Sequence, residues 1–166
     1  MSTAQWYHCL GIRDRGWRHV GMKFSGNTVT VRIAIDLSYL ACPNCGSRDV
    51  IRQGQIERRL LAGQMNFKRM IVSFGLQRIK CRSCGTIRQI KIGFADQNRR
   101  YTKQFERYVL ELSREMTIQG VARHLGVSRD VVKDIQKRYL GRKFGNPKLK
   151  QLRAIAIDEI YLGKRH

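Results

Sequence analysis

Two matched pairs of cysteines carry the clearest chemistry in this sequence. Two residues separate Cys42 from Cys45, two separate Cys81 from Cys84, and a glycine follows each pair. This spacing lets one tight turn direct both sulfurs of a pair to the same point, and glycine tolerates the positive φ that such a turn requires. Four thiolates are the ligand set of a closed tetrahedral zinc site. We therefore expect these cysteines to hold a structural Zn²⁺ ion in a zinc ribbon.

Disulfides and a redox site are the alternative uses of such cysteines. A secreted disulfide scaffold would begin with a signal peptide, and residues 1–10 have neither its basic start nor its apolar run. A thioredoxin-like site needs one Cys-x-x-Cys motif, not two matched ones. We expect the fifth cysteine, Cys9, to be a buried or idle thiol, and His124 to be a surface residue, not a further metal ligand.

The charge of the chain points to a polyanionic partner. Its 166 residues include 33 Lys and Arg against 12 Asp and Glu, which gives a net charge of +21. Nucleic acid is the commonest intracellular polyanion. An anionic membrane surface is a rival, but we find no basic amphipathic helix with an aromatic apolar face. No apolar run approaches the roughly 20 residues of a membrane span, so we expect a soluble, cytoplasmic, nucleoid-associated protein.

Strands are expected on both sides of the first cysteine pair. Branched apolar residues occupy every second position of residues 28–35, and residues 18–24 precede them across Ser25-Gly26-Asn27. Because glycine and asparagine suit a tight turn, the pattern predicts a β-hairpin. Further strand candidates are residues 67–79 and 87–92, whereas residues 56–61 are ambiguous.

The segment that spans the second cysteine pair is basic and free of acidic residues. From residue 58 to residue 95 it holds no Asp or Glu, but it holds nine Lys or Arg: Arg58, Arg59, Lys68, Arg69, Arg78, Lys80, Arg82, Arg88 and Lys91. We expect this segment to face phosphates. The alternative is that the charges only solvate exposed strand faces.

After a linker expected at residues 95–100, the apolar period becomes helical. Phe105, Val109, Leu112 and Met116 recur at intervals of four, three and four, the stripe of an amphipathic helix with Thr102 as its N-cap.

Residues 117–135 then predict a helix-turn-helix. Gly126 suits the left-handed end of a first helix, and Ser128 suits the cap of a second. The residues expected to pack inward are Ile118, Val121, Ala122, Leu125, Val127, Val132, Ile135 and Tyr139. The second helix could enter the major groove, and the residues expected to contact DNA are Arg129, Asp130, Lys133, Gln136 and Lys137. The alternative is a helical hairpin whose charged face meets only water.

The chain stays basic beyond this motif. Gly141 and the residues near it favour a flexible linker over residues 141–151, in which Lys148 and Lys150 would contact a phosphate backbone. The next segment is apolar and strand-like, and Asp158 lies where a strand could present a carboxylate to Mg²⁺. An Asp-Glu pair in an ordinary turn is the alternative.

The order of these features resembles the N-terminal part of bacterial insertion-sequence transposases of the ISL-three family. The resemblance rests on the Cys-Pro-x-Cys-Gly ribbon, the helix-turn-helix and the strand AIDEIYLGK, and it covers the chain from about Tyr39 onward. It implies that the ribbon and helix-turn-helix bind terminal inverted repeats. It also implies a ribonuclease-H-like domain that cuts and joins DNA with an Asp-Asp-Glu triad and two metal ions. Asp158 matches the first Asp of that triad, and Glu159 matches its non-catalytic neighbour.

The sequence departs from this family at its C-terminal end. His166 is the last residue, eight residues past Asp158, so the second Asp and the final Glu of the triad are missing. Two-metal strand transfer needs carboxylates from several strands. We therefore expect this chain to bind DNA without strand transfer of its own, and we assign Mg²⁺ only to a full-length homologue.

Together these features predict an α+β protein of several modules. The expected parts are an N-terminal β-hairpin region (1–38), a four-cysteine zinc ribbon (39–95), a three-helix helix-turn-helix domain (101–140), a basic linker (141–151) and the truncated start of a catalytic domain with an orphan first strand (152–166). The expected function is sequence-specific binding of double-stranded DNA at transposon inverted repeats, with a homodimer left open. The alternatives are a stand-alone transcription regulator and an RNA-binding zinc ribbon.

Overall fold

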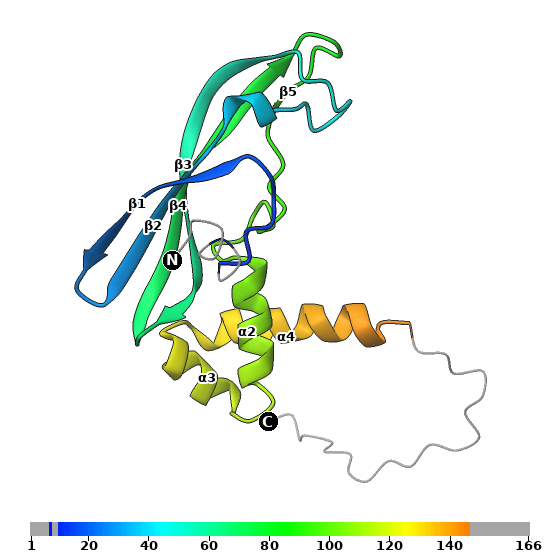
Figure 1. The fold of residues 1–166 in the computed structure, drawn as a ribbon. Helices are drawn as coiled ribbons and strands as arrows, with labels where there is room; N and C mark the ends of the chain where they lie inside the picture. Colours follow the sequence, from blue (N-terminus) through cyan, green and yellow to red (C-terminus); the bar gives the residue numbers. More distant parts are fainter. Residues whose placement is uncertain (1–6, 8–9, 147–166) are drawn as a thin grey trace, which may run out of the picture.

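A twisted sheet followed by three helices makes up the part of the chain that the computed structural model describes, residue 7 and residues 10–146 (Figure 1). The elements are β1 (Trp17–Ser25), β2 (Thr28–Ile35), the 3-10 helix η1 (Leu37–Tyr39), β3 (Val50–Met65), β4 (Lys68–Cys81), β5 (Ile87–Gln89), α2 (Lys103–Leu112), α3 (Ile118–Leu125) and α4 (Arg129–Phe144). N-terminal strands, clustered cysteines and three later helices confirm the expected α+β fold class.

The strands form one sheet in the order β1-β2-β4-β3, with β5 paired to β4. β1 and β2 make the expected hairpin, in which Ser25 pairs with Thr28 around a two-residue turn. β2 then runs parallel to β4, from the pair Thr28–Arg69 to the pair Arg32–Ser73. The N-terminal hairpin is therefore part of the same sheet as the strands next to the cysteines.

β3 and β4 form a long antiparallel hairpin. Their pairing runs from Val50–Cys81 at one end to Met65–Lys68 at the other. Residues 56–61, ambiguous in the sequence, lie in the middle of β3 because pairing along β4 outweighs a weak local preference. At about 3.3 Å per residue the hairpin is on the order of 40 Å long. It acts as an arm that separates the cysteines from the helices (Figure 1).

Apolar side chains from both hairpins fill one core. Val31 of β2 and Val72 of β4 are almost completely buried there. Trp17, Phe74 and Phe94 meet edge to face with ring centroids 5.2–5.4 Å apart, an arrangement that stabilises aromatic clusters beyond simple burial. The boundary expected at residues 38–39 thus separates two segments that share a single core.

The three helices enclose a second core that contains the expected inward residues of the helix-turn-helix except Tyr139, which is half-buried and lines a hollow between α2 and α4. Each helix begins at a hydroxyl cap, because Thr102, Thr117 and Ser128 accept hydrogen bonds from backbone N–H groups in the first turn. Gly126 ends α3 with a φ of 63°, as its position predicts. The buried members of this core are Tyr101, Phe105, Val109, Val121, Ala122, Leu125, Val132 and Ile135.

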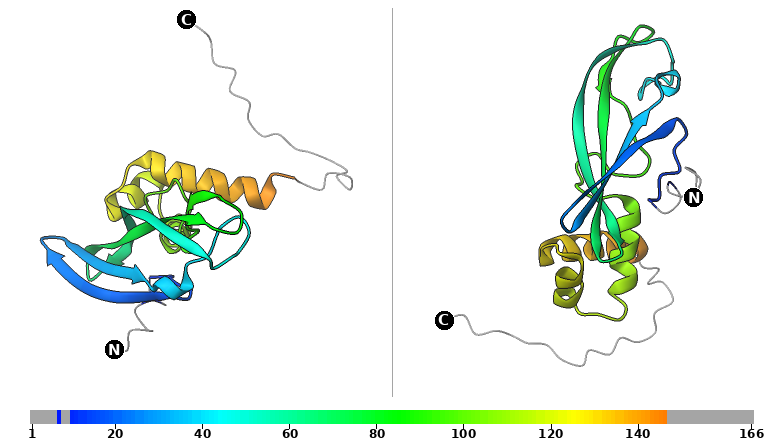
Figure 2. Two further views of the ribbon diagram at one scale, coloured as in Figure 1. Left: turned by 90° about the horizontal axis from the view of Figure 1, so that it is seen from above. Right: turned by 60° about the vertical axis from the view of Figure 1, so that its left-hand side comes forward.

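Residues 95–100, expected to be a linker, pack between the sheet and the helices. The N–H of Leu61 on β3 donates to the carbonyl of Arg100, and the N–H of Thr102 donates back to the carbonyl of Leu61, both at 2.9 Å. Tyr101 thereby forms a parallel bridge to Leu61. These bonds fix the helices on the part of the arm away from the cysteines, as Figures 1 and 2 show.

Three elements end at least three residues away from the end expected from the sequence. α2 ends at Leu112, so Met116 follows the helix and does not extend its apolar stripe. β5 is shorter than expected and ends at Gln89. α4 continues to Phe144, so Gly141 lies inside a helix where we expected a linker. Glycine costs a helix only about 1 kcal/mol relative to alanine, too little to end one that is otherwise supported. Among the described residues, no helix is long and apolar enough to cross a membrane.

Candidate metal centre and nucleic-acid interface

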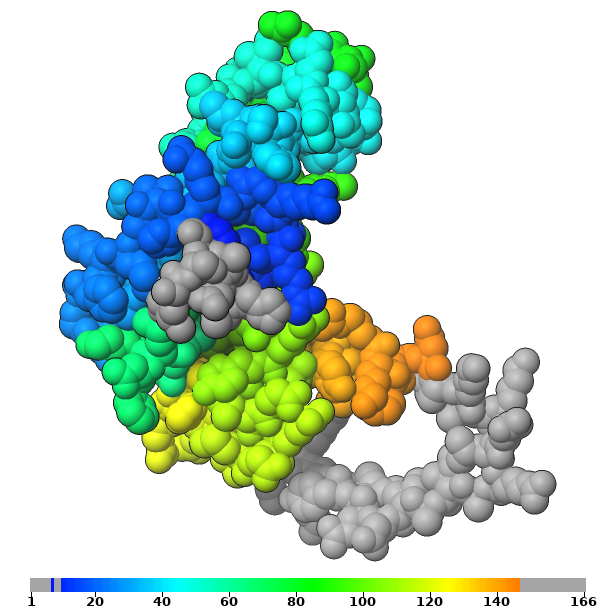
Figure 3. All heavy atoms as spheres, viewed as in Figure 1, coloured from blue at the N-terminus to red at the C-terminus, as the bar shows by residue number. Residues whose placement is uncertain are grey.

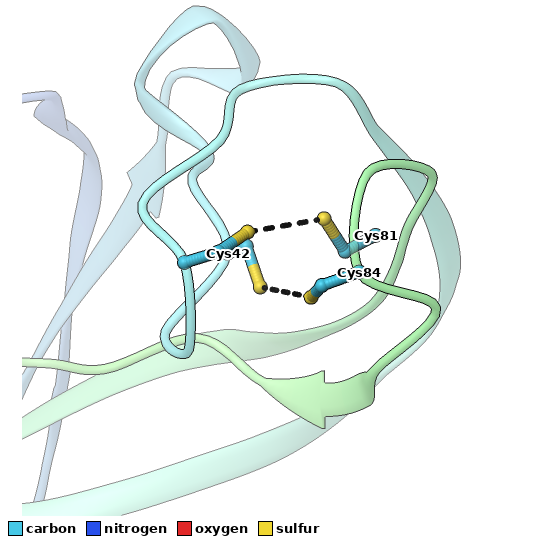
Figure 4. A group of neighbouring side chains, drawn as sticks. Cys42, Cys81 and Cys84 are labelled. Atoms are coloured by element: carbon cyan, nitrogen blue, oxygen red, sulfur yellow. Dashed lines mark hydrogen bonds between the residues drawn. The ribbon is translucent and has the colours of Figure 1, made fainter.

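The four cysteines expected as zinc ligands converge at one end of the β3/β4 hairpin, where Cys81 is the last residue of β4 (Figure 4). Their Sγ atoms all lie within 4.8 Å of one another. Cys42 Sγ lies 3.6 Å from Cys84 Sγ, and Cys45 Sγ lies 3.6 Å from Cys81 Sγ. A tetrahedral Zn²⁺ ion with bonds of about 2.3 Å would separate its sulfur ligands by roughly 3.8 Å. The cluster can therefore hold a metal ion with little rearrangement.

Both cysteine turns are built by the same backbone hydrogen bond. The N–H of Gly46 donates to the carbonyl of Cys42 at 2.9 Å, and the N–H of Gly85 donates to the carbonyl of Cys81 at 3.0 Å. The φ values of the two glycines are 75° and 71°, which confirms the expected need for glycine at these positions. Equivalent turns on separate segments can thus present their sulfurs to one shared point.

Contacts outside the sulfurs hold the two turns together. The hydroxyls of Ser47 and Ser83 lie 2.8 Å apart and share a hydrogen bond. The N–H of Arg82 donates to the carbonyl of Asp49 at 3.0 Å. Because each contact joins one turn to the other, the two turns are held together by groups other than their sulfurs.

The local hydrogen bonds make the thiols unequal. The hydroxyl of Thr86, followed by its N–H, lowers the pKa of Cys84 to about 6. The N–H of Ser47 alone would lower the pKa of Cys45, but the sulfurs of Cys84 and Cys81 beside it raise that pKa to about 12. The pKa of Cys84 therefore lies below the ordinary value of a thiol, and that of Cys45 lies above it. Metal binding at such a site releases protons.

α4 presents an exposed, charged face from its first residue onward. Ser128 caps the helix by accepting a hydrogen bond from the N–H of Val131 at 3.4 Å. The exposed residues among those expected to contact DNA are Arg129, Asp130, Lys133 and Lys137. Gln136 is half-buried and lies with Leu110 and Tyr139 in a hollow between α2 and α4. Contact between DNA and these side chains stays a prediction.

A polar cluster that the sequence analysis missed fixes α4 in place. Arg138 donates to the hydroxyl of Tyr101 at 2.8 Å and to the carboxylate of Glu106 at 3.0 Å. The Glu106 side chain is only 9% exposed. Burial by itself would lower the pKa of Arg138, but the hydrogen bond to Glu106 and its charge raise it. Asp134 extends the cluster by accepting from Arg99 at 2.7 Å. The sequence feature that could have indicated this cluster was Glu106, a carboxylate next to the apolar residue Phe105.

The basic segment of residues 58–95 does not form one continuous face. Successive residues of a strand point to opposite faces of its sheet, so Arg58 and Arg59 diverge. Arg58 lines a groove with Arg78, Arg88 and Lys91. Arg59 lines a concave region on the opposite face with Lys23 and Arg32. Binding of phosphates by either surface stays a prediction.

Several predicted residues lie outside the described part of the chain. They are Cys9, Lys148, Lys150 and Asp158. His124 is described, and it is exposed at the end of α3, as expected for a surface residue.

Residues 90–140 match the family described as the helix-turn-helix domain of transposase family ISL3. The match includes α2, α3 and most of α4, together with the segment that joins them to the sheet. It confirms the resemblance drawn from the sequence for this part of the chain and indicates that it binds DNA. Comparisons with curated proteins and with solved structures gave no match.

Proposed function

We propose that this chain binds double-stranded DNA sequence-specifically at the terminal inverted repeats of an insertion sequence, as the N-terminal part of an Asp-Asp-Glu transposase. The observation that carries the proposal is the match of residues 90–140 to a transposase helix-turn-helix, in a chain whose net charge is +21. The exposed face of α4 supports it. Arginine and lysine pair best with guanine and aspartate with cytosine, so Arg129, Lys133 and Asp130 favour a G·C-containing site.

Zn²⁺ is the proposed occupant of the cysteine cluster. Four thiolates in a closed tetrahedral arrangement are typical of structural zinc and leave no position open for substrate. In this role the metal would tie the segment before β3 to the end of β4. It would thereby stiffen the far end of the arm, where Lys80 and Arg82 are exposed.

Strand transfer is assigned to a complete catalytic domain and not to the DNA-binding region. The family resemblance gives Asp158 a place in an Asp-Asp-Glu triad, and two-metal chemistry needs carboxylates from several strands. The proposed task of the described residues is to hold the duplex in register for that domain.

Selection of duplexes from a random-sequence pool tests the proposal. The purified chain should enrich a consensus that also occurs, in inverted orientation, at both ends of the DNA element that encodes it. A consensus found only at a promoter would instead favour a transcription regulator. Equal capture of structured RNA and duplex DNA would favour an RNA-binding ribbon, and either outcome would contradict the proposal.

A further inference from the structure

The turn that joins β3 to β4 has a conformation and an exposure that its own packing does not explain. Asn66 and Phe67 form the turn, with φ values of 49° and 61°. Asparagine tolerates this left-handed region, whereas a bulky residue such as phenylalanine rarely adopts it, and glycine is the usual choice at the second position. Phe67 is also 85% exposed. The chain thus holds an aromatic ring in solvent on a strained backbone, a combination that clusters at functional sites.

The hairpin tip, defined as residues 64–69, rests against the turn between α3 and α4. Gln64 Nε2 donates to the carbonyl of His124, in the last turn of α3, at 2.8 Å. A Cβ placed on Gly126 would lie 4.0 Å from the side chain of Arg69. The tip therefore lies next to the segment that leads into α4, and Figure 3 shows it in green at the molecular surface beside the yellow α3–α4 segment.

Neighbouring strands hold the hairpin tip in position. The Lys68 ammonium donates to the carbonyl of Gly26 at 3.0 Å, and the N–H of Arg69 donates to the carbonyl of Asn27 at 2.9 Å. Both acceptors belong to the turn between β1 and β2. The tip is thus supported on one side by that turn and on the other by α3. These contacts fix the position of the backbone that carries Phe67.

The charge around the ring identifies its partner. Lys68 and Arg69 follow Phe67 directly, and the acid-free segment of residues 58–95 surrounds it in the sequence. An apolar partner surface would not call for this cationic setting, whereas DNA flanks its grooves with anionic phosphates and offers flat base faces to a ring that opens a base step. Phenylalanine is among the side chains that proteins insert between base pairs of a duplex.

We propose that Phe67 is a wedge that enters a groove of the same duplex that α4 reads and partly unstacks a base step there. The proposal rests on the DNA binding proposed above. It adds a second contact on β3/β4 that would bend the duplex beside the helix. Flexible pyrimidine–purine steps, which unstack most easily, are the expected place of insertion.

The substitution Phe67→Gly separates a DNA role from a structural one. It creates an Asn-Gly turn, which suits this backbone better than Asn-Phe. We therefore expect the thermal unfolding midpoint of the full chain to stay the same or rise. Affinity for a duplex selected from a random pool by the wild-type chain should nevertheless fall about tenfold, since stacking contacts are worth about 1–3 kcal/mol per base. A purely structural role for Phe67 would move these two measurements in the same direction.

Base unstacking gives a second, independent readout. 2-Aminopurine placed at successive positions of the selected duplex should brighten at one step when the wild-type chain binds. The increase should be absent with Phe67→Gly and retained with Phe67→Trp, which keeps a ring able to stack. As a matched control, Phe144→Ala removes another exposed aromatic ring, at the C-terminal end of α4. This substitution should leave the 2-aminopurine signal unchanged.

The outcomes distinguish this inference from the function on which it rests. If the wild-type chain binds no duplex, the proposed function fails. If it binds with a dependence on Lys133 but Phe67→Gly has wild-type affinity, the wedge is overturned and DNA binding stands. An affinity loss without any 2-aminopurine signal in the wild-type complex would also overturn the wedge.

Discussion

Cys45 is exposed, so its replacement would remove a proposed zinc ligand without opening a cavity in the core. We expect Cys45→Ser to lose most of its zinc, because three thiolates no longer complete a closed tetrahedral set. Structural zinc contributes about 10–16 kcal/mol in small zinc-finger peptides. Hydrogen exchange should therefore quicken around residues 42–52 and 78–89, while α2, α3 and α4 keep their protection. Metal analysis by mass spectrometry, run beside the exchange measurement, checks the zinc content.

Cys9 supplies the matched control for this substitution. Cys9→Ser changes the one cysteine that the sequence places outside the two Cys-x-x-Cys motifs, so its zinc content should equal that of the wild type. A Cys45→Ser protein with one tightly bound zinc ion, or a Cys9→Ser protein without zinc, would show that the ligand set is different.

Single residues were predictable where a local rule determines them. The spacing of Cys42 and Cys45 and the glycine that follows them are sufficient to predict a turn that directs both sulfurs toward one point. The geometry of such a turn depends only on neighbouring residues in the chain. Phe67 and Arg138 were not identified. The first depends on a strained turn beside a helix, and the second depends on partners more than 30 residues away. Apart from the carboxylate of Glu106 beside Phe105, no local sequence pattern indicates either of them.

At the level of the helices, the Arg138–Glu106 pair should determine how firmly α4 is held against α2. Replacing Arg138 by Met would leave the nearly buried carboxylate of Glu106 without its cation, which costs several kcal/mol for a buried pair. We expect Arg138→Met to lower the free energy of unfolding by about 2 kcal/mol, reduced for its partial exposure. A double-mutant cycle with Glu106→Gln, followed by chemical denaturation, measures the coupling between the two side chains.

The Arg114–Glu111 pair is a suitable reference for that cycle. Its atoms are 2.9 Å apart, as close as those of Arg138 and Glu106, but its side chains are 69% and 62% exposed. Because water screens exposed pairs, its coupling should be about 0–0.5 kcal/mol. Equal coupling in the two pairs would mean that burial does not strengthen the Arg138 cluster.

Helices and strands were predictable where their sequence signals are local. The β1/β2 hairpin follows from its alternating pattern, and the helix-turn-helix follows from its caps and from Gly126. The parallel pairing of β2 with β4 and the bridge from Leu61 to Tyr101 were not predictable. They join segments distant in the chain, and their register depends on the packing of the whole sheet.

On the scale of the whole molecule, the β3/β4 arm separates two regions that could contact one duplex at different places (Figure 2). The helices and the hairpin tip lie at one end, and the cysteine cluster lies at the other. Basic residues line both faces of the arm, and we expect them to add sequence-independent attraction to DNA.

The central claim is that α4 selects a DNA sequence. Its most direct test is a binding titration of the selected duplex and a scrambled duplex over a range of salt concentrations, with Lys133→Ala beside the wild type. We expect both affinities to fall steeply with salt, by a log–log slope of about 0.9 per phosphate contact, and the selected duplex to bind at least about 10³-fold more tightly. Lys133→Ala should lose about 1–3 kcal/mol on the selected duplex and much less on the scrambled one. Equal affinity of the wild type for the two duplexes, or a Lys133→Ala protein that discriminates as the wild type does, would contradict the claim.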